Sequence, residues 1–189
     1  MKNKLLLSLF ILISLLSNAQ LREGQNFCDE SPEGNYFPLS LNKKNILWAD
    51  TYYTEDKIGT KIINGKTYLE FKQNWKNIAP TTLFLRKENN VVYQYEECCK
   101  KETIRYDSNF KKDHLWKSAD GLREYKIVSY KGKLKTPYCS YKNLLVINAK
   151  LSFGEFKFYY LKGHGYIGAT ENNKLVSCIS PSLETLKEK

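Results

Sequence analysis

The sequence of 189 residues is poor in the features that mark membrane spans, metal sites and common catalytic centres. Beyond an apolar run at residues 5–16, no eighteen consecutive residues are apolar, so we expect no transmembrane helix. Only two histidines, His114 and His164, are present, and no Cys-x-x-Cys pair occurs, which argues against structural zinc. Gly-x-Ser-x-Gly and His-Glu-x-x-His motifs are also absent. The sequence therefore predicts neither a metal nor a cofactor.

The first nineteen residues have the pattern of a secretory signal peptide. Two lysines precede the apolar run, and Ser17-Asn18-Ala19 supplies small residues at the cleavage position. The first cysteine is Cys28, away from that position, so a lipid-anchored lipoprotein is not expected. We expect residues 1–19 to be removed and residues 20–189 to form a single β-rich domain that is periplasmic or secreted.

Aromatic and β-branched residues are abundant and recur in short alternating runs. Residues 67–72 and 155–158 alternate apolar with polar side chains, which is the period of a strand with one buried face. Asn64-Gly65 between two such runs is the strongest short-range hairpin signal. Asn89-Asn90 and Asn172-Asn173 are weaker turn signals of the same kind. The pattern is therefore typical of strands joined by short hairpins.

An all-β fold follows from this pattern. We expect about ten strands, including residues 47–54, 83–87, 91–95, 103–106, 125–130, 144–150, 166–170 and 175–179. Any helix is expected to be short and confined to the C-terminal segment after Pro181. Strands connected in this way form a curled antiparallel meander that hides one apolar face, which is an open or half barrel.

Four segments carry a resemblance to a known group of proteins. They are Ile63–Tyr68, Leu85–Tyr95, Tyr106–Phe110 and Tyr159–Gly168. In this order they resemble the TapB-like group of exported bacterial β-proteins, which is related to open-barrel periplasmic proteins, and the resemblance covers about residues 36–180. The chain departs from the group at His164, where a small apolar residue is usual, and at Lys112-Asp113, where Gly-Asp is usual. The group offers no established catalytic residues, so the resemblance implies only a fold and an exported location.

The five cysteines are Cys28, Cys98, Cys99, Cys139 and Cys178. In an oxidising compartment disulfides are the default. Cys98 and Cys99 are adjacent in a loop, and in an extended segment their side chains point to opposite sides. We predict that one of them bonds a distant cysteine, with Cys28 as the candidate, and that Cys139 pairs with Cys178. The fifth cysteine then remains a buried thiol, forms an adjacent disulfide, or bonds another chain.

A cysteine hydrolase is one alternative that the sequence leaves open. Cys139 or Cys178 could act as the nucleophile, with His164 or His114 as the base. No papain-like sequence surrounds any of the cysteines. The sequence therefore favours a protein that is not an enzyme.

Lys131, Lys133 and Lys135 would share one face of an extended segment, with Lys126 and Lys142 close in sequence. The formal net charge is +10. A row of lysines can attract an anionic polysaccharide, a lipid headgroup or nucleic acid. It can also protect an exposed strand edge from aggregation, which is the interpretation we favour. No nucleic-acid-binding motif accompanies the charge, so a nucleic-acid partner is not expected.

The aromatic residues Trp48, Tyr52, Tyr53, Trp75 and Trp116 are candidates for the wall of a cavity. In an open barrel such residues can hold a lipid tail or stack on a sugar. They can instead form the core and cross-strand pairs. The sequence thus predicts an exported β-protein that binds a lipid or glycan in the concave face of its sheet. The alternative is an envelope structural protein that contacts another envelope protein and binds no small ligand.

Overall fold

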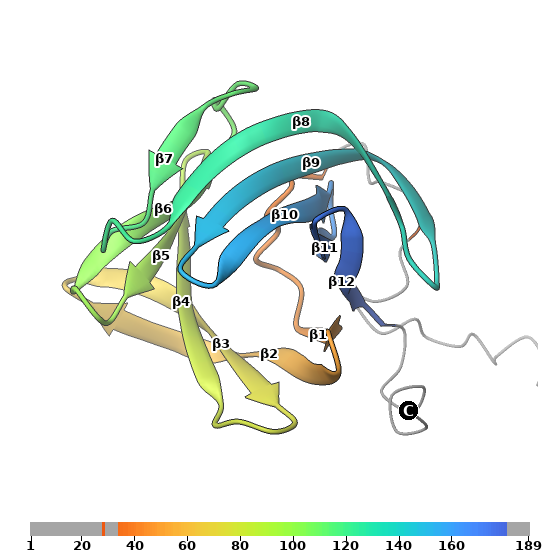
Figure 1. Ribbon diagram of the computed structural model, residues 1–189. Helices are drawn as coiled ribbons and strands as arrows, with labels where there is room; N and C mark the ends of the chain where they lie inside the picture. Colours follow the sequence, from red (N-terminus) through yellow and green to blue (C-terminus); the bar gives the residue numbers. More distant parts are fainter. Residues whose placement is uncertain (1–27, 29–33, 181–189) are drawn as a thin grey trace, which may run out of the picture.

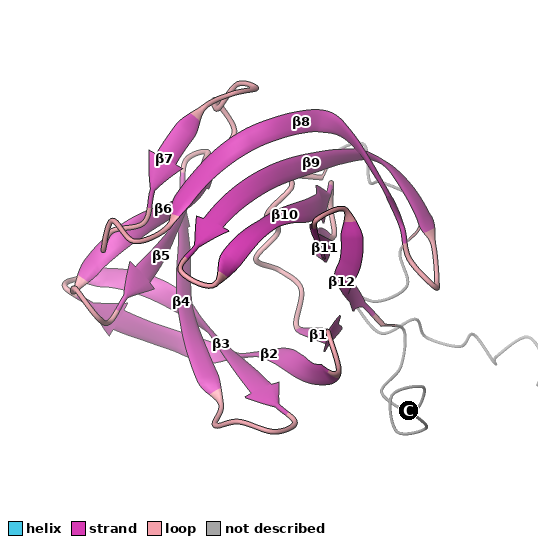
Figure 2. Ribbon diagram, in the orientation of Figure 1, coloured by secondary structure: helices cyan, strands magenta, loops and turns pink. Residues whose placement is uncertain are grey.

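In the computed structural model, Cys28 and residues 34–180 are described, and all regular structure among them is β (Figure 1, Figure 2). Twelve strands form one antiparallel sheet. They are β1 (Lys43–Trp48), β2 (Thr51–Ile63), β3 (Lys66–Trp75), β4 (Thr81–Glu88), β5 (Val91–Glu96), β6 (Lys101–Asp107), β7 (Leu115–Lys117), β8 (Glu124–Lys135), β9 (Ser140–Leu151), β10 (Gly154–Leu161), β11 (Gly165–Glu171) and β12 (Lys174–Ile179). The expected all-β class is confirmed, with twelve strands in place of about ten.

The order of the strands makes the sheet a nearly closed barrel. It runs β6-β5-β4-β3-β2-β1-β12-β11-β10-β9-β8-β7, so β1 pairs with β12 and the two sheet edges are the consecutive strands β6 and β7. Figure 1 shows the sheet curling until these edges approach each other. The gap between them, called the seam below, is bridged by side chains. The indole Nε1 of Trp116 donates to the carbonyl of Ile104 at 2.8 Å, and the amide of Ala119 donates to Oγ1 of Thr103 at 2.8 Å.

Two of the predicted turns have the backbone geometry that their residues favour. Asn64 and Gly65 have φ values of 50° and 75°, and Asn172 and Asn173 have 49° and 62°. Positive φ at both central residues is the requirement of a type I′ hairpin. At these two places the sequence alone specifies the reversal of the chain.

The prediction of a single strand over residues 47–54 is wrong. Leu47 pairs with Tyr52, because the chain reverses at Ala49, which has a φ of 50°. Alanine rarely adopts this conformation, so no residue preference marks the turn. The short β7 also escaped prediction, since three residues are too few to show a period. The helix expected after Pro181 lies outside the described residues.

The hairpin of β8 and β9 is long enough to contribute to two cores. One end packs inside the barrel, where Ile127, Leu145 and Ile147 are buried with Tyr125 and Tyr160. The other end bends around β10–β12 (Figure 1), where it buries residues in a cluster that includes Leu134, Cys139, Tyr141, Leu144, Val146, Tyr159 and Leu161. A Cβ atom added at Gly168 of β11 would lie 3.0 Å from the Leu134 side chain. The hairpin therefore covers the sheet face opposite to the barrel interior.

A polar network holds β3, β4 and β6 together on their outer face. Arg86 pairs with Glu102 through Nε, and through Nη2 at 3.0 Å, and its Nη1 lies 2.6 Å from Oε2 of Glu88. The hydroxyl of Tyr68 and Nζ of Lys66 donate to Glu102 at 2.7 and 2.8 Å. The hydrogen bond from Arg86 is the largest cause that lowers the pKa of Glu102 to about 2 from its ordinary 4.5. Glu102 is therefore a carboxylate in the folded protein over the physiological pH range.

Glu102→Gln should lower the free energy of unfolding by about 3 kcal/mol at pH 7, because Arg86 keeps its buried charge and loses its main partner. A carboxylate whose pKa is lower in the folded state stabilises the protein fully above its unfolded pKa near 4.5. That stabilisation is lost as the pH falls toward about 2. Urea unfolding between pH 7 and 2 should show the two proteins converging in stability across this window.

The matched control is Glu70→Gln. Glu70 lies on β3 and, among the described residues, forms no ion pair. Its substitution should change stability by less than about 0.5 kcal/mol at any pH. A difference between wild type and Glu102→Gln that stayed constant from pH 7 to 2 would show that the network does not act through the charge of Glu102.

Candidate functional site

The interior of the barrel contains a cavity of about 770 Å³. Ligand sites in proteins span about 300–1,000 Å³. In barrels of about eight strands the interior is filled by side chains or holds one small ligand, and the diameter grows with the number of strands. Twelve strands therefore leave room here both for side chains and for a molecule of moderate size.

Most of the cavity wall is apolar. All three tryptophans of the chain, Trp48, Trp75 and Trp116, line it. Aliphatic and phenylalanine side chains from β1, β3–β6, β9 and β10 complete it, among them Ile46, Phe71, Leu83, Leu85, Val92, Ile104, Ile147 and Phe158. These residues alternate along their strands with residues of the other face, so the period of two that predicts the strands also builds the wall.

The segment before β1 occupies part of the interior. Phe37 stacks on Tyr160 of β10 and Tyr106 of β6, with ring centroids 4.3 and 5.1 Å apart. Tyr36 packs against Tyr106 and Tyr130 at 6.1 and 5.9 Å. Figure 1 shows this part of the chain, in orange, passing through the barrel. Phe37 and the following residues Pro38, Leu39 and Leu41 also line the cavity, so the segment helps to shape it.

Gly34 anchors this segment against the turn between β10 and β11. A Cβ at Gly34 would lie 2.3 Å from the backbone nitrogen of Gly163, which itself donates to the carbonyl of Asn35 at 2.8 Å. Gly34→Ala should therefore push the two backbones apart and destabilise the protein by about 1–3 kcal/mol in denaturant unfolding. Gly59→Ala is the control, because a Cβ there meets nothing within 4 Å. Equal stabilities of the two variants would contradict the close approach.

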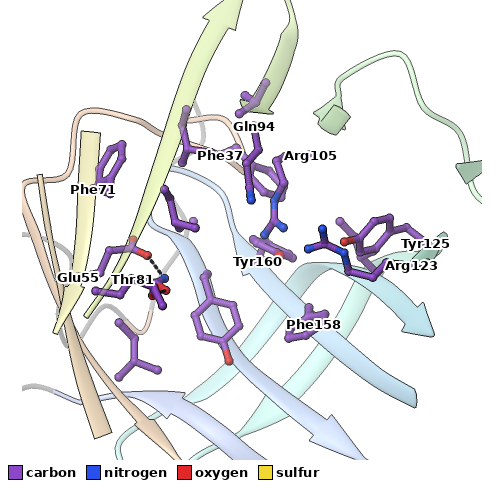
Figure 3. Close-up of a pocket in the computed structure, with 18 of the residues that line it drawn as sticks. Phe37, Glu55, Phe71, Thr81, Gln94, Arg105, Arg123, Tyr125, Phe158 and Tyr160 are labelled. Carbon is purple, nitrogen blue, oxygen red and sulfur yellow. Dashed lines mark hydrogen bonds between the residues drawn. The ribbon is translucent and has the colours of Figure 1, made fainter. Parts of the chain in front are cut away.

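Lys44 and Glu55 form a compensated pair of charges in the wall. Burial lowers the pKa of Lys44, and the negative charge of Glu55 opposes that shift. Glu55 also accepts a hydrogen bond from Nε2 of Gln73 at 2.8 Å, drawn as a dashed line in Figure 3. Each of these charges thus has a neighbour of opposite sign or a hydrogen-bond donor.

A second polar group lies near the seam and contains two arginines. Arg123, just before β8, lies 3.0 Å from Oε2 of Glu96 and 3.3 Å from Oδ2 of Asp120. Arg105 on β6 and Tyr160 on β10 both line the cavity, and the positive charge of Arg105 acts to lower the pKa of Tyr160 against the larger opposing effect of burial. Figure 3 shows both guanidinium groups pointing toward the same part of the pocket, beside Tyr160. The apolar cavity therefore has one cluster of charged groups near the seam, in which Arg123 is paired with two carboxylates.

Of the aromatic residues predicted to form a cavity wall, all but Tyr52 line the cavity. Trp48, Trp75 and Trp116 line the cavity, as does Tyr53. Tyr52 does not line it, because successive residues of a strand point to opposite faces. Its ring lies under Nζ of Lys76, which is 5.5 Å from the ring centroid.

The lysines of the predicted basic row do not reach the cavity. Lys131, Lys133 and Lys135 are exposed on β8, where Leu134 between them is buried in the cluster outside the barrel. The cavity arginines Arg105 and Arg123 were missed by the sequence interpretation. The sequence does contain one indication of Arg105, because it is a charged residue within the predicted half-buried strand at residues 103–106.

The cysteine pairing differs from the one expected. Cys28 is bonded to Cys139, with a Cα–Cα distance of 5.4 Å, so neither a bond from Cys28 to Cys98 or Cys99 nor one between Cys139 and Cys178 is present. Cys98 and Cys99 are thiols with their Sγ atoms 3.3 Å apart, and Cys178 is a buried thiol. The turn of β8 and β9 carries Cys139 to the N-terminal segment, whereas Cys98 and Cys99 lie in the turn between β5 and β6.

This pairing bears on the cysteine hydrolase alternative. Cys139 is consumed by a disulfide, which leaves it no thiolate to act as a nucleophile. Cys178 is not among the residues that line the cavity. His114 is exposed, and its ring stacks on Phe110 with centroids 3.7 Å apart. The cavity and the proposed nucleophiles are therefore separate features of the molecule.

The described part of the chain contains neither a cluster of metal-binding side chains nor a membrane-spanning helix. No three histidine, cysteine or acidic side chains gather there as a metal would require. No helix there has the length and apolar character needed to cross a membrane. Comparison of the chain with models of protein families, with curated proteins and with solved structures finds no match.

Proposed function

We propose that this protein binds a lipid-like ligand whose apolar chain occupies the barrel cavity. The observation that carries the proposal is the cavity of about 770 Å³ with a wall of tryptophan, phenylalanine and aliphatic side chains. Burial of a hydrocarbon chain in such a wall gains about 0.8 kcal/mol for each methylene group removed from water. A few polar groups in a largely apolar pocket are typical of sites that bind and orient one small molecule.

A lipid chain fits this wall better than a glycan does. A sugar needs hydrogen-bond partners for many hydroxyl groups, because each unpaired one that is buried costs free energy. Uncharged polar side chains in the wall are few, among them Gln73, Thr81, Gln94 and Ser152. An envelope structural protein without a ligand would instead fill its interior with side chains, so the cavity favours a binding protein over this alternative.

The exported location and the resemblance to TapB-like proteins belong to the same proposal. The disulfide of Cys28 and Cys139 supports an oxidising compartment, where such bonds persist. The curled antiparallel meander is the kind of fold that the resemblance implies. Both observations support an exported binding protein.

Intrinsic fluorescence can test the proposal, because all three tryptophans line the cavity. The purified protein, its disulfide intact, is passed over a lipid-adsorbing resin and titrated with bromine-substituted twelve-carbon alkyl ligands. Bromine should quench the fluorescence of the tryptophans in a saturable way. The unbrominated ligand should reverse the quenching by competing for the cavity. A neutral oligosaccharide of similar mass should have no effect.

The alternatives predict different results in this titration. Saturable binding of the oligosaccharide and none of the alkyl ligands would favour a glycan-binding protein. Binding of neither would favour the envelope structural protein and overturn the proposal.

A further inference from the structure

Arg105 reaches the cavity from an irregular place in the sheet. Val92 of β5 pairs with Tyr106 and Tyr93 pairs with Ile104, so Arg105 between them faces no residue of β5. Such an extra residue is a β-bulge, which redirects a side chain and is frequent beside functional sites. The bulge places a guanidinium group in a wall that is otherwise mostly apolar. Arg105 also belongs to the strand that forms one side of the seam.

The charge of Arg105 lacks a direct counter-charge. Among the residues that the structure describes, no carboxylate lies within ion-pair distance of Arg105, whereas Arg123 has two, Glu96 and Asp120. Burial acts to lower the pKa of Arg105, but Tyr160, Tyr125 and Glu96 raise it above its ordinary value. The guanidinium group is therefore charged at every pH that the protein meets. A half-buried cation beside apolar side chains is stabilised by an anion that replaces its lost hydration.

A second unsatisfied group lies beside Arg105. Gln94 pairs with Thr103 on the same two strands, lines the cavity, and is only 7% exposed. Its side-chain Oε1 has no hydrogen-bond partner among the described residues. Because an amide can turn so that its NH₂ group or its oxygen faces the cavity, Gln94 can donate to an anion. Figure 3 shows Gln94 and Arg105 on the same side of the pocket.

From this arrangement we infer that the apolar ligand carries a carboxylate, which Arg105 binds, so that the ligand class is long-chain monocarboxylic acids. The inference rests on the proposed function. The planar guanidinium group offers two parallel N–H donors that match the two oxygens of a carboxylate. Tyr160, which burial keeps protonated by raising its pKa, remains a hydroxyl beside the same guanidinium. The hydrocarbon chain then extends along the wall that contains the tryptophans.

Lys44, the other cation of the wall, is the weaker candidate for this contact. Its charge is compensated by Glu55, and burial favours its neutral form. The surroundings of Arg105 also discriminate among anions. Glu96, whose Oε1 has no hydrogen-bond partner among the described residues, acts electrostatically on Arg105, and Glu96 and Asp120 both pair with Arg123 in the same wall. These carboxylates should repel a second negative charge on the ligand. A singly charged carboxylate should therefore bind more tightly than a doubly charged phosphate monoester.

The test compares dodecanoate, dodecanol and dodecyl phosphate at pH 8 by calorimetry and tryptophan fluorescence, with wild type, Arg105→Gln and Lys133→Gln. We expect wild type to bind dodecanoate at least about tenfold more tightly than dodecanol, as for a hydrogen bond to a charged group. Dodecyl phosphate should bind more weakly than dodecanoate. Arg105→Gln should lose the preference for dodecanoate and keep the affinity for dodecanol. Lys133→Gln, at an exposed lysine of β8, should behave as wild type.

The outcomes separate this inference from the proposed function. If no twelve-carbon ligand binds to wild type, the proposed function fails. If wild type binds all three ligands equally, only the assignment of the headgroup fails, and this comparison does not depend on the folding of a variant. Arg105→Lys is a second variant that retains the positive charge. It should keep only part of the preference, because lysine lacks the paired donors of arginine. If the preference for dodecanoate over dodecanol is lost in Lys44→Met and kept in Arg105→Gln, the carboxylate binds Lys44 and the inference is overturned.

Discussion

Leu85→Trp should weaken the binding of dodecanoate by about 100-fold. Leu85 lines the cavity from β4 and is only partly buried, so a larger side chain extends into the space of the ligand. An indole in place of isobutyl displaces about three to four methylene groups of the ligand, each worth about 0.8 kcal/mol. That sum corresponds to roughly 50–200-fold in the dissociation constant. The tryptophan introduced at position 85 adds its own fluorescence, so the dissociation constant should be measured by calorimetry.

Thr82→Trp is the matched control for this substitution. Thr82 lies on the same strand, three residues away, is exposed and does not line the cavity. It should leave binding unchanged, and both variants should unfold within a few degrees of wild type. If Leu85→Trp binds dodecanoate as wild type does while remaining folded, the ligand does not occupy the cavity, and the proposed function loses its main support.

Cys28→Ser should lower the melting temperature by roughly 10–20 °C. The disulfide joins residues 111 positions apart, and closing a loop of about 100 residues in the unfolded chain is worth about 4–5 kcal/mol. For a protein of this size, 1 kcal/mol shifts the melting temperature by about 2–4 °C. Cys28 is exposed, so the hydroxyl itself costs little, and the buried Cys139 thiol remains in its cluster. Calorimetry measures the shift, and reduced wild type should melt near the variant.

The control is the double variant Cys98→Ser and Cys99→Ser. These thiols are outside the disulfide, so the melting temperature should stay within about 2 °C of wild type. Peptide mapping without reduction should find Cys28 linked to Cys139, and Cys98 and Cys99 modified by an alkylating agent. A peptide that links Cys28 to Cys98 or Cys99, or a Cys28→Ser variant as stable as wild type, would contradict the structure at this bond.

The two parts of the proposal differ in what they require of the fold. The apolar wall needs only that the barrel curls, because alternation along each strand then presents one set of side chains inward. The carboxylate site needs the bulge that turns Arg105 into the cavity and the placement of Gln94 on the neighbouring strand. The wall therefore tolerates many substitutions that preserve volume, whereas the headgroup site depends on a few positions.

The local features of this protein were determined by its sequence. Alternation of apolar and polar residues predicted the strands, and Asn64-Gly65 and Asn172-Asn173 predicted their turns, because side-chain period and φ preference belong to neighbouring residues. The tryptophans could be named as candidate wall residues for the same reason. Where the local signal was missing, as at Ala49, the prediction joined two strands into one.

The features that decide function depend on residues far apart in the chain. The pairing of β1 with β12 sets which strands form the seam, and the bond of Cys28 with Cys139 spans 111 residues. The meeting of Arg105 with Arg123 and Tyr160 follows from the curl of the whole sheet. Such contacts are chosen by the total free energy of packing among many alternatives, so no short segment encodes them. Sequence alone therefore determined a curled β-sheet with aromatic candidates, and only the tertiary structure decided that they enclose a cavity with an arginine in its wall.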